Sequence, residues 1–112
     1  MMQPKVLNKH RMDNGVTLEL MLQADLFWFQ GHFPCQPILP GVTQLHWVME
    51  YARQELALAG EFGGFDVLKF QQPLLPDQRV TLTLHWLAEK NKLTFSYQVG
   101  DRQASNGKIN LC

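Results

Sequence analysis

Three prolines within seven residues, Pro34, Pro37 and Pro40, most constrain what this chain can form. Proline fixes φ and has no backbone N–H, so this stretch cannot be a helix interior or a central strand. Residues 26–41 are therefore predicted to form an ordered loop rich in aromatic residues. Behind the loop, apolar residues recur at alternating steps of three and four, the spacing of one stripe of an α-helix. These residues are Val42, Leu45, Met49, Ala52, Leu56 and Ala59.

Alternating apolar and polar residues on both sides of this predicted helix indicate strands. One strand, residues 16–22, precedes the loop, and glycines within residues 60–64 end the helix at about residue 59. A meander of about four strands should follow, at residues 67–72, 80–87, 93–99 and, with a weaker pattern, 103–111. This order predicts an α+β fold in which one long helix lies on one face of an antiparallel sheet of about five strands. We expect a single domain over residues 1–112, whose open sheet edges favour dimerisation.

Charge and cysteine content exclude several classes of function. Ten basic and ten acidic residues give a formal net charge of zero, without the excess basic charge that nucleic acid or an anionic membrane attracts. No apolar run reaches the ~20 residues of a membrane span, and residues 1–6 lack the apolar core of a secretory signal. Two cysteines without CxxC spacing, Cys35 and Cys112, cannot form a zinc site alone. We expect a cytoplasmic protein that uses no cofactor and no metal.

His32 is the first candidate for chemistry because it lies in the constrained loop before the helix. Pro40 and Gly41 lead directly into that helix, so free N–H groups and the positive end of the helix dipole should face the same loop. Proton abstraction beside a thioester carbonyl requires a general base next to such an oxyanion site, since the enolate oxygen must be stabilised. A histidine that merely packs at a turn is the alternative interpretation.

His46 and Glu50 lie one turn apart on the predicted helix, where side chains at i and i+4 meet. Glu50 would fix the tautomer of His46 or favour its protonated form, which leaves His46 as a proton donor near neutral pH. A solvated polar face continued by Arg53 explains the spacing equally well. The remaining histidines suggest no chemistry: His10 lies in a terminus without a pattern, and His85 is an ordinary strand residue.

Residues 31–42 read GHFPCQPILPGV and resemble the GHFPxxPxxPGV signature of the bacterial 3-hydroxyacyl-(acyl-carrier-protein) dehydratases. The resemblance covers most of the chain, since residues 27–29 match the aromatic approach to the histidine and residues 70–78 are similar to an FxxPxxPGDQ segment. It implies a hotdog fold, a helix wrapped by a curved antiparallel sheet, which works as at least a dimer. Residues 42–47 resemble a divergent branch of thioester dehydratases that includes enzymes of aryl polyene lipid pathways.

The resemblance implies roles for individual residues. His32 matches the catalytic histidine of the family, and the N–H of Gly41 matches the amide that binds the carbonyl. The family's acid, a Glu or Asp, lies five residues after that glycine, where this chain has His46; Glu50 would orient this imidazole. The residues expected to contact the substrate are Phe33, Pro40, Val42 and Trp47.

The implied function is dehydration of a 3-hydroxyacyl thioester on acyl carrier protein to the trans-2-enoyl thioester, in fatty acid or aryl polyene-type lipid biosynthesis. His32 would remove the C2 proton, and His46 from a partner subunit would protonate the departing hydroxyl. Two alternatives stay open: a hotdog acyl thioesterase, and a non-catalytic acyl-binding module, which the missing carboxylate at position 46 makes plausible. The expected partners are acyl carrier protein and further copies of this chain, as a homodimer or a higher oligomer.

Overall fold

The computed structural model describes residues 2–30 and 37–112, so His32, Phe33 and Cys35 lie outside the described residues. Within them the chain forms two strands, one long helix, α1 (Gly41–Leu56), and then four strands. Two short 3-10 helices, η1 (Phe27–Phe29) and η2 (Ala88–Lys90), complete the secondary structure of this part. The strands are β1 (Lys5–Met12), β2 (Gly15–Met21), β3 (Phe62–Phe70), β4 (Arg79–Leu87), β5 (Lys92–Val99) and β6 (Arg102–Leu111).

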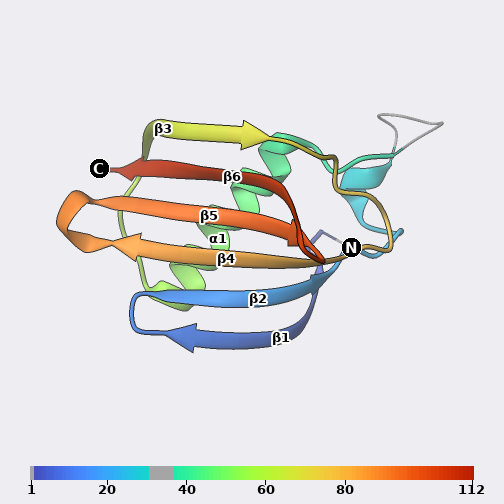
Figure 1. Ribbon diagram of the computed structural model, residues 1–112, viewed down its shortest axis with the longest axis horizontal. Helices are drawn as coiled ribbons and strands as arrows, with labels where there is room; N and C mark the ends of the chain where they lie inside the picture. Colours follow the sequence, from blue (N-terminus) through green and yellow to red (C-terminus); the bar gives the residue numbers. More distant parts are fainter. Residues whose placement is uncertain (1, 31–36) are drawn as a thin grey trace.

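These strands form one antiparallel sheet in the order β1-β2-β4-β5-β6-β3, and α1 crosses one of its faces (Figure 1). Strands β4, β5 and β6 pair consecutively, as their short separators predict. The prediction that β3 belongs to the same meander is wrong, because β3 pairs with β6 at the far edge of the sheet. Residues 71–78, which join β3 to β4, contain Pro73 and Pro76 and a positive φ of 65° at Asp77. Such a connection is no tight hairpin.

The N-terminal residues, His10 included, form a sixth strand that the sequence did not predict. β1 pairs with β2 from Lys5 to Met12, with one irregularity in register between Val6 and Asn8. Every residue of β1 is exposed. An edge strand of this kind buries neither face, and therefore lacks the apolar alternation by which β2 can be identified in the sequence.

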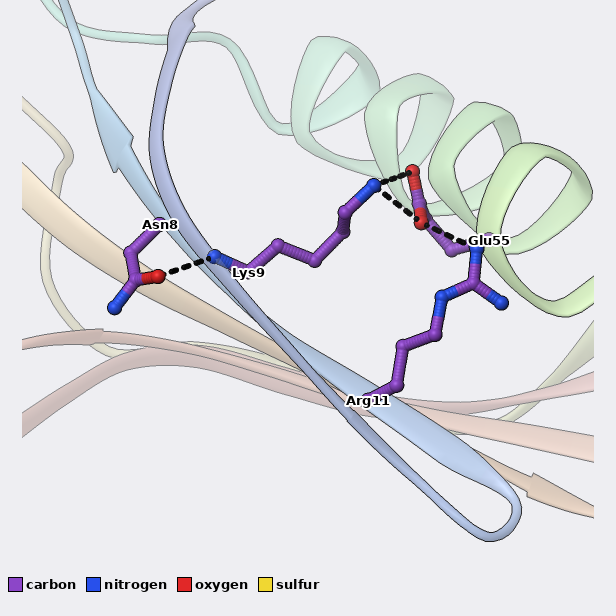
Figure 2. A network of polar contacts seen from close by, with 4 residues as sticks. All are labelled: Asn8, Lys9, Arg11 and Glu55. Atoms are coloured by element: carbon purple, nitrogen blue, oxygen red, sulfur yellow. Dashed lines mark hydrogen bonds and ion pairs between the residues drawn. The ribbon is translucent and has the colours of Figure 1, made fainter.

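A network of polar contacts joins β1 to the end of α1 (Figure 2). The Oε1 atom of Glu55 lies 3.1 Å from Lys9 Nζ and 3.1 Å from Arg11 Nη2. The Glu55 side chain is only 13% exposed, whereas those of Lys9 and Arg11 are 44% and 62% exposed. Ion pairs from Lys9 and Arg11 to one mostly buried carboxylate therefore connect the edge strand to the helix.

The helix ends earlier than the sequence predicts. Its last residue is Leu56, and Ala57 adopts the left-handed conformation with a φ of 55°. After Ala57, Leu58 packs against the hydrophobic core. This contact stabilises an end of the helix before Gly60. No helix in the described ranges is long and apolar enough to cross a membrane.

Two sides of α1 have different surroundings. The side that faces the sheet is buried and includes Trp47, Val48 and Ala52, which pack against the leucines of β2 and β4. Of the apolar stripe that predicted the helix, Ala52 is buried, whereas the residues near the helix start lie beside the buried side: Val42 is 77% exposed, and Leu45 is only partly buried. The helix therefore presents an apolar strip that this chain leaves open.

Candidate functional site

An open groove of about 500 Å³, here called the Gly41 groove, lies beside the start of α1. One wall is formed by Gly41, Val42 and Leu45 of the helix, and the other by Leu68 and Phe70 of β3. Long apolar walls with a few polar groups are typical of sites that bind an apolar ligand. The groove is therefore suited to an acyl chain.

Backbone N–H groups at the start of α1 provide the polar end of this groove. The N–H groups of Thr43 and Gln44 donate to Pro40 O at 3.1 and 3.2 Å, and no side chain caps the helix. Those of Gly41 and Val42 have no acceptor among the described residues. Free donors at the positive end of a helix dipole can hold a carbonyl oxygen and stabilise negative charge that develops on it.

Gly41 allows β3 to approach this helix start closely. A Cβ atom at this position would lie 2.8 Å from Cζ of Phe70 and 3.1 Å from Cε1. The Phe70 ring therefore packs directly against the backbone of Gly41. A residue with a side chain at position 41 would displace the ring and change the shape of the groove.

His46 and Glu50 form the contact that their spacing predicts, with Nε2 of His46 3.1 Å from Oε1 of Glu50. The other carboxylate oxygen, Oε2, accepts a hydrogen bond from the side-chain amide of Gln3. His46 lines a second open groove of about 400 Å³, the His46 groove, together with Phe62 and Phe65 of β3. Its side chain is 58% exposed, so it is free to reach a ligand or a partner chain.

The structure does not bring His46 and Gly41 to one groove within a single chain. Five residues along an α-helix turn the side-chain direction by about 140°, and the two residues accordingly line different grooves. Val42 and Leu45 line both, so the grooves adjoin along the exposed apolar strip of α1. Pro40 takes the N-cap position of the helix.

Trp47 and Tyr51 face the core and line neither groove. Trp47 is fully buried, and its indole N–H has no hydrogen-bond partner among the described residues. Burial, assisted by the negative charges of Glu50 and Glu55, raises the pKa of Tyr51 to about 12. The Tyr51 hydroxyl therefore stays protonated near neutral pH and cannot act as a base.

The sequence analysis missed a buried polar cluster at the helix start. The hydroxyl of Ser105 donates to Oε1 of Gln44 at 2.8 Å, and the hydroxyl of Tyr97 donates to the backbone oxygen of Gln44 at 2.6 Å. The Gln44 amide donates in turn to Leu39 O at 3.4 Å. Burial raises the pKa of Tyr97 well above its usual value, so its hydroxyl remains a donor. One residue in the sequence could have indicated this cluster: Gln44 is polar but lies on the side of the helix that faces the sheet.

Comparison with known families and curated proteins gives matches to dehydratases. The ApeI-like family model, described as ApeI dehydratase, matches residues 8–108. A 3-hydroxyacyl-[acyl-carrier-protein] dehydratase FabZ from Mannheimia succiniciproducens is 36% identical over 78 residues, which cover 59% of this chain and 49% of that protein. The chain thus spans about half the length of the curated relatives it matches.

Solved structures agree with the sequence matches. The dehydratase heterocomplex ApeI:P from Xenorhabdus doucetiae contains a chain with 42% identity and a TM-score of 0.93, with 99% of both chains covered. Thioesterase superfamily member 2 from Mus musculus superposes with a TM-score of 0.69 at 11% identity, over 91% of this chain and 77% of that one. At this identity the second match concerns the fold alone. The fold is a hotdog, as the resemblance implies, with six strands in the described part in place of about five.

Proposed function

Because the chain belongs to the ApeI-like dehydratase family, we propose that it dehydrates a 3-hydroxyacyl thioester carried by acyl carrier protein to the trans-2-enoyl thioester. The pathway would be fatty acid or aryl polyene-type lipid biosynthesis. The observation that carries the proposal is the apolar Gly41 groove, whose N–H groups at the helix start are free to hold a thioester oxygen. A substrate with an apolar chain next to a polarised carbonyl fits both features.

In the proposed reaction, His32 takes the proton from C2 while the N–H of Gly41 stabilises the enolate oxygen. The electron pair of the C2–H bond forms the C2=C3 double bond as the C3–O bond breaks. His46 gives its proton to the departing hydroxyl, which leaves as water, and Glu50 holds the imidazole in place. Proton exchange with solvent then returns both histidines to their starting states.

A second copy of the chain would supply His46 to the Gly41 groove. Two observations support β3 as the edge that this copy covers. β3 exposes Phe62, Phe65 and Phe70, and these side chains continue the apolar strip of α1. β1, at the opposite edge, carries Lys5, Lys9 and Arg11 and an irregular register, features that oppose edge-to-edge pairing.

The proposed unit is therefore a homodimer formed through β3 and the two grooves. The related structure from Xenorhabdus doucetiae is a dehydratase heterocomplex, so a different subunit is the alternative occupant of the same surface. Size measurements on this chain alone distinguish the two, because a chain that depends on a different subunit stays monomeric.

The test of the activity is a product assay on 3-hydroxyacyl thioesters of acyl carrier protein that vary in chain length and aromaticity. Mass spectrometry should show loss of one water with the thioester intact. Release of free thiol instead would establish a thioesterase. Tight binding of the acyl chain without any turnover would establish a binding module, and either of these results contradicts the proposal.

A further inference from the structure

We infer that Gln44 is a positioning residue for this dehydration: its buried side chain fixes the start of α1, and with it the N–H of Gly41, relative to the walls of the groove. The inference rests on the proposed function. Gln44 is 3% exposed, and its side chain and backbone oxygen together make three hydrogen bonds, to the residue before Pro40 and to β5 and β6.

Leu39, two residues before the first residue of α1, is held through both of its backbone groups. Its N–H donates to Leu74 O at 2.8 Å, and its carbonyl oxygen accepts the Gln44 side-chain amide at 3.4 Å. The backbone N–H and the carbonyl oxygen of Leu39 are therefore both held by hydrogen bonds. Pro40 has a fixed φ, and its carbonyl oxygen, which shares a planar peptide group with the Gly41 N–H, accepts the N–H groups of Thr43 and Gln44. With Leu39 held as well, the Gly41 N–H has little freedom to turn.

Strand β6 holds the opposite wall of the Gly41 groove. The carbonyl oxygen of Ala104 accepts the N–H groups of Gln71 and Gln72 at 2.8 and 3.1 Å, directly after β3. The next residue, Ser105, donates to Gln44 and is paired in register with Phe70 of β3. Two consecutive residues of one strand thus connect to both walls of the Gly41 groove and set the distance between them.

A buried hydrogen bond between neutral groups contributes only about 1 kcal/mol net to stability, and a buried partner left without one costs about 1–3 kcal/mol. A satisfied polar network does, however, select one geometry among similarly packed ones. Gln44, Tyr97 and Ser105 should consequently matter more for the position of the Gly41 N–H than for the stability of the fold.

Gln44→Met in the full chain tests the inference, because methionine has a similar size and shape but no amide. Gln103→Met is the matched control, since Gln103 is exposed at the start of β6. We expect kcat for Gln44→Met to fall about 10- to 100-fold with KM nearly unchanged, whereas the control behaves as the parent. The carbonyl stretching band of a bound, isotopically labelled thioester should also shift toward its position in free solution, which loss of packing alone would not cause.

Ser105→Ala keeps the test decisive if Gln44→Met does not fold, because it removes a single hydroxyl from the cluster. Its kcat should fall in the same direction, and the double variant should lose less than the product of the two single effects. Folded variants with the kcat and the carbonyl band of the parent overturn the inference alone. A parent protein that binds the thioester without dehydrating it overturns the proposed function, and this inference with it.

Discussion

Gly41→Ala probes the proposed carbonyl-binding position with the smallest possible change. The added methyl group would lie 2.8 Å from Cζ of Phe70, while ordinary contacts begin at 3.4 Å, so the ring must retreat by at least 3.4 − 2.8 = 0.6 Å. Phe70 is 49% exposed and can move, and replacing glycine in a helix gains up to about 1 kcal/mol. We therefore expect the free energy of unfolding to change by no more than about 1 kcal/mol.

Activity should respond much more strongly than stability to this variant. Gly41 and Phe70 both line the groove, so a ring displaced by the methyl group changes the shape of the groove beside the Gly41 N–H. A misplacement of 1 Å can lower a rate about 100-fold, so a shift of 0.6 Å corresponds to a loss in kcat/KM of about tenfold. Thermal unfolding and steady-state formation of the enoyl thioester, measured on the same preparation, separate the two effects.

A second substitution identifies the cause of the loss. Leucine at position 70 lacks the ring atoms that the new methyl group would meet, so Gly41→Ala combined with Phe70→Leu should recover part of the activity. Phe70→Leu alone serves as the reference. A folded Gly41→Ala variant with the kcat/KM of the parent would show that the thioester oxygen is not held at this helix start.

Three further predictions concern other parts of the molecule. His46→Gln should abolish dehydration in a folded protein, and His46→Glu should retain some activity, because it restores a carboxyl group; a fully active His46→Gln would move the acid role elsewhere. Phe65→Lys should convert the proposed dimer to inactive monomers in light-scattering and activity measurements, whereas Val6→Lys, the same type of change on β1, should leave the oligomeric state unchanged. Hydrogen bonds from Lys92 and an asparagine of β6 lower the pKa of Asp66, so its stabilising effect is complete above the unfolded-state pKa and disappears as pH falls through the folded-state value. Acid unfolding of Asp66→Asn should therefore show a weaker pH dependence than that of the parent, and an unchanged dependence would contradict this assignment.

Local patterns predicted the elements that have one buried side. β2 alternates as expected, with Val16, Leu18 and Leu20 in the core, and the contact between His46 and Glu50 follows from helical spacing. β1 could not be found in this way because both of its faces are exposed. The strand with which β3 pairs could not be predicted either, since nothing in the sequence pattern of β3 indicates that it pairs with β6 instead of β4.

Local patterns in the sequence could not predict the whole site either, because some of its contacts join residues that lie far apart in the sequence. Gln44 reaches Tyr97 and Ser105, which are 53 and 61 residues away, and only the folded sheet brings them together. Trp47, the residue after His46, was among the residues expected to contact the substrate. One residue along a helix is a turn of about 100°, and that turn directs Trp47 into the core while His46 stays on the exposed side.

The contact between His46 and Glu50 restricts how an imidazole can replace the family's carboxyl group. Nε2 of His46 lies 3.1 Å from Oε1 of Glu50, so a proton on Nε2 is donated to that carboxylate in a hydrogen bond. In the neutral tautomer that makes this contact, Nδ1 carries a lone pair and can only accept a hydrogen bond. Protonation of a leaving hydroxyl therefore requires the doubly protonated ring, with Nδ1–H directed at the substrate. In the proposed mechanism Glu50 therefore does more than orient His46, because its carboxylate stabilises the positive charge of the ring until the proton is transferred to the hydroxyl.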